Sequence, residues 1–288
     1  MFRALFTAAA LIAASPVFAA FQSDRISVTT EGTGPDVVLI HGLASSPRIW
    51  SGTVERVPGY RYHLVQIAGM GATEPGANAQ GAVIAPVAEE VARYIAEEKL
   101  DKPALIGHSM GGTIAMMVAA RHPDEVGKLM VVDMHPFVGQ LYGGPAATSD
   151  SVRPIADAMR ARSAKATPEE RERERRASIT SMINTESERA GPIEDGLASN
   201  PDTVANAFAE LMVTDLRPEL KAITAPTTVL YVTPAGAPFT DEQMDEGYKA
   251  AYADLSGVTL KRIPNAAHFI MLDAPDAFAD EVKAFLKP

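Results

Sequence analysis

Cysteine is absent from the 288-residue chain, so neither disulfide bonds nor a lipid-anchoring cysteine can form. Basic residues are in the minority, with 26 Lys and Arg against 36 Asp and Glu. The resulting net charge of −10 leaves no basic stripe to neutralise nucleic-acid phosphates. The sequence also lacks an evident cluster of metal ligands. These absences argue against a nucleic-acid-binding protein and a metal-dependent hydrolase, and we expect no cofactor.

The first 19 residues have the pattern of a secretory signal peptide. Arg3 precedes an apolar run at residues 4–14, which is too short to span a bilayer, and suitable residues occupy positions −3 and −1 of a cleavage site after Ala19. No twin-arginine pair is present, which favours the ordinary export route. We expect a periplasmic or secreted bacterial protein without a stable membrane anchor after cleavage; an uncleaved anchor is the alternative.

Hydrophobic residues make up 47% of the chain, enough for the core of one large domain with an insertion. Helical periodicity alternates with short apolar runs, which predict strands at residues 36–40, 60–67, 103–106, 129–133, 227–232 and 258–263. Such alternation is typical of βα units. We therefore predict an α/β fold with a mostly parallel central sheet flanked by helices.

Between residues 134 and 221 the strand pattern disappears and only helical patterns remain. We interpret this segment as a helical insertion between two parts of one core domain, residues 20–133 and 222–288. Its charge run, 168–176, is interpreted as a solvated helix face with Glu–Arg pairs at i,i+4, with a binding surface as the alternative. The methionines of this segment either line an acyl pocket or pack against the core.

The pentapeptide Gly107-His108-Ser109-Met110-Gly111 lies between a predicted strand and a predicted helix. This G-x-S-x-G pattern, in a strand–turn–helix context, is typical of a nucleophile elbow, in which a tight turn exposes the serine hydroxyl. The helix that follows directs its positive end toward the serine. We predict Ser109 as a nucleophile and the N–H of Met110 as an oxyanion donor.

A serine nucleophile needs a base, and His268 is the candidate. It follows the last predicted strand and precedes the last predicted helix, which begins at about Ala274. An imidazole can accept and return a proton near neutral pH. The run His41-Gly42-Leu43 follows the strand at 36–40, where a loop supplying a second oxyanion donor is expected.

Taken together, these motifs resemble the α/β-hydrolase family, in particular its serine esterase and lipase-like group with a helical cap. The matching pieces are His41-Gly42 with Trp50, the Gly107–Gly112 run, Asp215-Leu216-Arg217-Pro218-Glu219-Leu220, and Ala267-His268-Phe269. The resemblance covers about residues 25 to 287 and implies that Leu43 supplies the second oxyanion N–H. We also expect substrate contacts from His41, Trp50, Phe137 and Phe269.

The chain departs from the family pattern in the acid that orients the histidine. The family usually carries it after the strand that follows the cap, but Thr233-Pro234-Ala235-Gly236-Ala237-Pro238 has no carboxylate. Some members carry the acid at the end of the strand before the cap, where Asp133 lies, and we predict Asp133. The alternatives are Asp241 and Glu242, whose position at a helix start also suits capping.

We therefore expect a serine hydrolase that cleaves a small-molecule carboxylic ester through an acyl-enzyme. Serine at position 109 excludes the Asp-nucleophile dehalogenases and epoxide hydrolases of this fold. An aminopeptidase, a carbon–carbon bond hydrolase and a cofactor-free haloperoxidase share the same triad and remain alternatives. A hydrolase-like binding protein with decayed catalysis is a further alternative.

Overall fold

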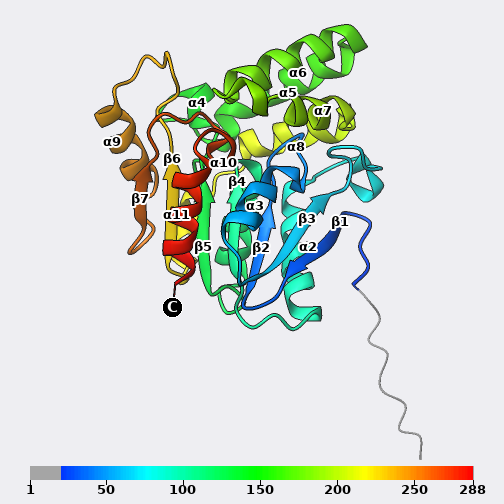
Figure 1. Ribbon diagram of the computed structural model, residues 1–288. Coiled ribbons are helices and arrows are strands. Elements are labelled where there is room, and N and C mark those ends of the chain that lie inside the picture. Colours follow the sequence, from blue (N-terminus) through cyan, green and yellow to red (C-terminus); the bar gives the residue numbers. More distant parts are fainter. Residues whose placement is uncertain (1–20, 288) are drawn as a thin grey trace, which may run out of the picture.

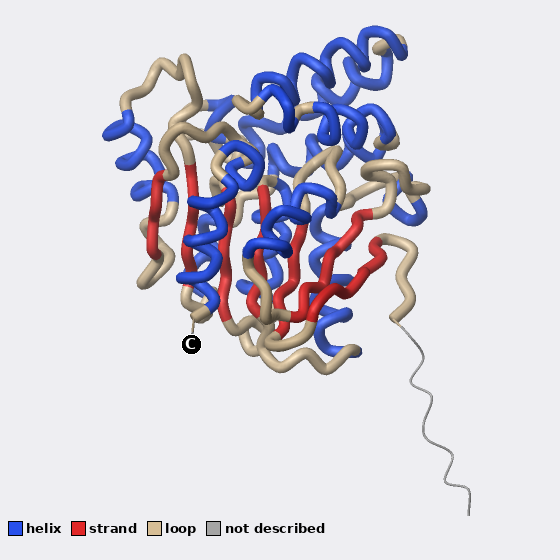
Figure 2. Tube along the Cα trace, viewed as in Figure 1, coloured by secondary structure: helices blue, strands red, loops and turns tan. Residues whose placement is uncertain are grey.

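The computed structural model describes residues 21–287, and the predicted signal peptide lies outside the described residues. A seven-stranded sheet forms the centre of the molecule (Figures 1 and 2), in the order β1-β3-β2-β4-β5-β6-β7. The strands are β1 (Ile26–Gly32), β2 (Asp36–Ile40), β3 (Arg61–Ile67), β4 (Ala104–His108), β5 (Lys128–Val132), β6 (Thr227–Tyr231) and β7 (Thr259–Arg262). Only β1 runs antiparallel, against β3, so the predicted mostly parallel sheet is confirmed.

Strand β1 was not predicted from the sequence. Ile26 is its one buried residue, and the rest of the strand is exposed or half-buried at the sheet edge. A strand with a single buried position has neither an apolar run nor a regular alternation of apolar and polar residues. Hydrophobic periodicity therefore does not predict it. The buried strands β2, β4 and β5 have the continuous apolar sequences expected of a sheet covered on both faces.

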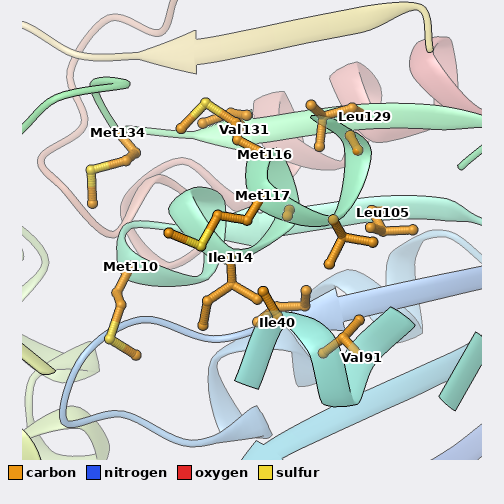
Figure 3. Packing of buried hydrophobic residues seen from close by; sticks show 14 of the residues in the cluster. Ile40, Val91, Leu105, Met110, Ile114, Met116, Met117, Leu129, Val131 and Met134 are labelled. Atoms are coloured by element: carbon orange, nitrogen blue, oxygen red, sulfur yellow. The ribbon is translucent and has the colours of Figure 1, made fainter. Parts of the chain in front are cut away.

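Helices cover both faces of the sheet. The core helices are α1 (Ser51–Arg56), α2 (Ile84–Glu97), α3 (Met110–Arg121), α9 (Asp241–Ala251), α10 (Ile270–Asp273) and α11 (Pro275–Leu286). Val38 and Ile40 point to the side of α2, α3 and α9, whereas Val37 and Leu39 point to the side of α1, α10 and α11. Figure 3 shows the first of these two cores, with Ile114 of α3 beside Ile40. Packing on both faces fixes the parallel strands in register.

A helical cap is inserted between β5 and β6 and lies over one end of the sheet (Figure 1). Its helices are α4 (Gln140–Gly143), α5 (Ser149–Lys165), α6 (Pro168–Met182), α7 (Ala190–Ala198) and α8 (Pro201–Val213). Helix α8 ties the cap to the core, because the Glu210 carboxylate accepts hydrogen bonds from the amides of Val83, Ile84 and Ala85 at the start of α2. In residues 21–287, no helix combines the length and hydropathy needed to cross a bilayer.

Candidate active site

Ser109 occupies the turn between β4 and α3 in a conformation that few side-chain-bearing residues adopt. Its φ of 54° and ψ of −125° lie outside the usual regions, as in strained functional turns. The turn depends on two glycines. A Cβ on Gly107 would lie 2.1 Å from the carbonyl oxygen of Gly111, and one on Gly111 would lie 2.2 Å from that of Ile40. No side chain fits at either glycine, which explains the spacing of the motif.

Backbone hydrogen bonds fix the turn in place. The amide of Ser109 donates to the carbonyl of Val132 at the end of β5, over 2.9 Å. The Ser109 carbonyl accepts from the amides of Gly112 and Thr113 at the start of α3. Ser109 is thereby held between the end of the sheet and the first turn of a helix, and it lines a cavity beneath the cap.

His268 and Asp133 are brought together from positions 135 residues apart. The Nδ1–H of His268, in the loop between β7 and α10, donates to Oδ2 of Asp133 over 2.6 Å. Asp133 directly follows β5, and its positive φ of 51° is one that Asp tolerates better than most residues. Because Nδ1 is engaged with the carboxylate, Nε2 is the ring nitrogen available to Ser109. His268 and Ser109 line the same cavity.

The second oxygen of Asp133 has two donors of its own. Oδ1 accepts from the amide of Val232, over 3.2 Å, and from the hydroxyl of Tyr248 on α9, over 3.1 Å. Tyr248 is buried and stacks on Tyr231 at 4.0 Å between ring centroids. Burial raises the pKa of the Tyr248 phenol well above its usual value, so it remains a neutral donor. The sequence offered no signal for Tyr248, which reaches the site only through folding.

The alternative acids lie elsewhere. Asp241 and Glu242 are exposed in the first turn of α9, where Thr240 forms the N-cap. Asp241 pairs with Arg262 at 2.7 Å, and neither acid contacts His268. The end of β6, where the family pattern places a carboxylate, instead supplies the Val232 amide to Asp133.

His108 supports the backbone of the histidine loop. Its Nε2 lies 3.0 Å from the carbonyl oxygen of His268, and because a carbonyl can only accept, Nε2 carries the proton. The two imidazole rings are 4.6 Å apart between centroids. Burial holds the pKa of His108 well below its usual value, so a neutral ring stands beside His268.

The two predicted oxyanion donors flank Ser109. Leu43 lines the cavity, and Met110 is the first residue of α3. Within residues 21–287 the amides of Leu43 and Met110 donate to no protein acceptor. Gly42 allows the close approach of the Leu43 loop, because a Cβ there would lie 3.1 Å from the Cβ of Ser109. Two free N–H groups and the positive end of α3 are thus available for an anionic oxygen.

His41 does not reach the cavity, so its prediction as a substrate contact is wrong. The ring is fully buried: Nδ1 donates to the carbonyl of Gly42 over 2.8 Å, and Nε2 accepts from the amide of Ile67 over 3.1 Å. Burial lowers the pKa of His41 to about 4, which keeps the ring neutral near pH 7. His41 thereby holds the loop at residues 41–43 against β3.

Trp50 and Phe137 are also absent from the cavity wall, contrary to prediction. Trp50 is fully buried in the core and stacks on Phe278 of α11. Phe137 is fully buried at the base of the cap, under the guanidinium of Arg217. An apolar sequence pattern marks burial but does not distinguish a core from a pocket. Phe269, the fourth predicted contact, does line the cavity.

The cavity has a volume of about 690 Å³ and lies between the core and the cap. Its cap wall is mixed: charged side chains come from α5 and α6, and apolar contributions come from Met159, Ile179, Met182, Val204, Phe208 and Leu211. Two cap methionines thus line the pocket, whereas Met212 packs inside the cap. No group of three or more metal-ligating side chains occurs in the described part of the chain.

A sequence profile described as the Alpha/beta hydrolase family matches residues 37–281. The chain belongs to this family. The predictions of an α/β-hydrolase fold and of a hydrolytic enzyme are thereby confirmed. Two curated relatives are named pimeloyl-[acyl-carrier protein] methyl ester esterase. That of Nitrosomonas europaea is 25% identical over 266 residues, which is 88% of this chain and 96% of the relative.

The second of these relatives is more similar over a shorter segment. The enzyme of Vibrio vulnificus is 35% identical over 108 residues, covering 37% of this chain and 40% of that protein. Among solved structures, an esterase from Exiguobacterium antarcticum superposes with a TM-score of 0.77 and 21% identity. That superposition covers 91% of this chain and 96% of the esterase, and it shows the shared fold.

Proposed function

We propose that this protein hydrolyses carboxylic esters by an acyl-enzyme route. Ser109 is the nucleophile, His268 the general base, Asp133 the residue that orients it, and the amides of Leu43 and Met110 form the oxyanion hole. The observation that carries the proposal is the 2.6 Å contact between His268 Nδ1 and Asp133, in a cavity that Ser109 also lines. Nucleophile, base and orienting acid are the parts that serine hydrolysis requires.

Acylation starts when Ser109 Oγ attacks the ester carbonyl carbon and His268 Nε2 takes the hydroxyl proton. The carbonyl oxygen becomes an oxyanion, which the N–H groups of Leu43 and Met110 stabilise; each such donor contributes about 3 kcal/mol to the transition state. Asp133 stabilises the imidazolium through Nδ1–H. The carbon–oxygen bond to the alcohol then breaks, and His268 returns the proton to the leaving alkoxide.

Deacylation repeats these steps with water. His268 takes a proton from the water as its oxygen attacks the acyl carbon, and the same two amides hold the second oxyanion. The bond to Ser109 breaks, His268 protonates Oγ, and the carboxylic acid leaves. The neutral His108 beside His268 adds no second positive charge that would disfavour the imidazolium.

Ester hydrolysis is favoured over the other reactions of this fold by relatives that are named as methyl ester esterases. The pocket agrees with an acyl substrate, because apolar side chains form part of its cap wall. The test is turnover of p-nitrophenyl acetate, butyrate and octanoate by the purified protein. We expect saturable hydrolysis of at least one ester. Binding without turnover would indicate a hydrolase-like binding protein and overturn the proposal.

We also propose that the protein is exported and processed after Ala19. The support is the sequence pattern of residues 1–19. When the full chain is expressed in a bacterium with an ordinary export pathway, the protein in the periplasmic fraction should begin at Ala20 by mass spectrometry. An intact Met1 on protein in the membrane fraction would contradict this and support an uncleaved anchor.

A further inference from the structure

One face of cap helix α6 forms part of the cavity wall. Arg171, Arg175, Ile179 and Met182 all line the cavity, at the i,i+4 and i,i+3 spacing that places side chains on one helical face. This corrects the interpretation of the charge run as a solvated face only. Glu172 and Arg176 do form an i,i+4 pair, at 2.8 Å, but the face bearing Arg175 looks into the pocket.

Arg175 forms no ion pair of its own within residues 21–287, and the carboxylate that acts on its charge, that of Glu174, is itself paired with Arg162. Other charged groups of the cavity wall are paired with neighbours: Glu172 with Arg176, Glu174 with Arg162 at 2.6 Å, and Arg160 with Asp157 at 3.0 Å. Arg171 donates to the carbonyl of Ala166 and forms no ion pair in the described part of the chain. Within residues 21–287, Arg175 forms neither an ion pair nor a hydrogen bond. The wall of the pocket therefore carries a guanidinium that no described carboxylate engages by an ion pair or a hydrogen bond.

Arg175 is seated in the wall and does not extend freely into water. It is half-buried, and its stem passes over Gly196 of α7, where a Cβ would lie 2.8 Å from Cδ of Arg175. Burial lowers the pKa of the Arg175 guanidinium from its usual value, because the loss of water outweighs the opposing attraction of the Glu174 carboxylate. A partly desolvated guanidinium with all its donors free is costly unless a ligand supplies the acceptor.

The position of Arg175 along α6 determines how far it lies from the proposed catalytic residues. The carbonyl of Met182, at the end of α6, accepts from the amide of Phe269, the residue after His268. Seven residues separate Met182 from Arg175, which at the rise of an α-helix is roughly 10 Å. Ile179 and Met182 line the intervening wall. An apolar chain can thus extend from the catalytic residues along α6 and end at the guanidinium.

We infer that the substrate carries a carboxylate at the far end of its acyl chain and that Arg175 binds it. This rests on the proposed ester hydrolysis and specifies its substrate class, a monoester of a dicarboxylic acid. The ester carbonyl lies at Ser109, the methylene chain lies against Ile179 and Met182, and the guanidinium pairs with the carboxylate in the fork geometry that suits it. Arg171, one turn earlier on the same face, adds positive potential.

The test compares monomethyl adipate with methyl hexanoate, which has the same six-carbon acyl chain but no terminal carboxylate. Methanol release gives kcat/KM for each ester. We expect the wild type to prefer the monoester. Arg175→Gln should lower the ratio of the two kcat/KM values by about 10- to 100-fold, which is the effect expected from the loss of one charge-assisted hydrogen-bonded pair. Arg175→Lys should recover part of the ratio, because it keeps the charge but not the fork.

Arg173→Gln is the matched control, because Arg173 is exposed on the same helix, outside the cavity wall, and the change removes the same charge. It should keep the wild-type ratio. Adipate should also inhibit methyl hexanoate hydrolysis by the wild type more strongly than hexanoate does, a readout that needs no variant. Equal inhibition, or an unchanged ratio in Arg175→Gln, would overturn the inference while leaving ester hydrolysis intact. Failure of the wild type to hydrolyse any ester would refute the proposed function instead.

Discussion

Replacing Ser109 with alanine is expected to reduce kcat for p-nitrophenyl butyrate by on the order of 10⁶-fold, as for a serine hydrolase that loses its nucleophile. His268, Asp133 and both oxyanion amides would remain, but no oxygen would be present to form the acyl-enzyme. The variant should fold, because alanine is no larger than serine and the backbone bonds of residue 109 to Val132, Gly112 and Thr113 need no side chain.

Two measurements separate lost chemistry from lost structure. A fluorophosphonate probe should label the wild type at Ser109 and leave Ser109→Ala unlabelled, and circular dichroism and thermal unfolding should match between the two proteins. Ser256→Ala, an exposed serine far along the sequence, is the control and should retain labelling and activity. A folded Ser109→Ala variant with wild-type turnover would exclude Ser109 as the nucleophile.

Replacing Asp133 with asparagine is expected to reduce kcat by up to ~10⁴-fold, the size of the effect for the equivalent change in a serine protease. The reason lies in the donors around the side chain. Because Oδ1 accepts from the amide of Val232 and the hydroxyl of Tyr248, the single oxygen of asparagine would face these two donors. Its NH₂ group would then face His268 and require an unprotonated Nδ1. The proton would move to Nε2, which could no longer accept one from Ser109.

Asn also tolerates the positive φ of residue 133, so the backbone should persist. Asp241→Asn and Glu242→Gln are matched controls, since both change one carboxylate to its amide in exposed positions on α9. Each should retain activity within a few-fold of wild type, because an acidic residue in the first turn of a helix contributes at most about 1 kcal/mol to stability and no chemistry. If Asp133→Asn kept a kcat near that of the wild type and either control lost most of its activity, the orienting acid would be a residue of α9 and not Asp133.

The site residues differ in how far local sequence could predict them. Ser109 was predictable because its turn is a local structure: Gly107 and Gly111 are required where a Cβ would collide with backbone. For the proposed acid, the sequence left a choice between Asp133 and the downstream carboxylates, because Asp133 and His268 come together only through the sheet. Parallel strands end at the same edge, so residues after β5 and β7 converge there although the sequence separates them widely.

The lining of the cavity was the least predictable part of the site. Aromatic residues such as His41, Trp50 and Phe137 are types that often line pockets. All three are nevertheless fully buried away from the cavity. Tyr248 joins the site from α9 without any motif. Helical periodicity shows which residues share a face of a helix but not whether that face contacts solvent, the core or a pocket. For this reason the sequence analysis placed Arg175 on a solvated face.

The sequence by itself therefore determined the class of fold, the helical insertion and the nucleophile turn, because each follows from short-range periodicity or from the steric demands of glycine. The tertiary structure alone decided that the carboxylate of Asp133 reaches His268, that aromatic residues near the motifs belong to the core, and that one face of α6 encloses the pocket. These depend on which surfaces pack against each other, and contacts between distant segments leave no local pattern in one chain.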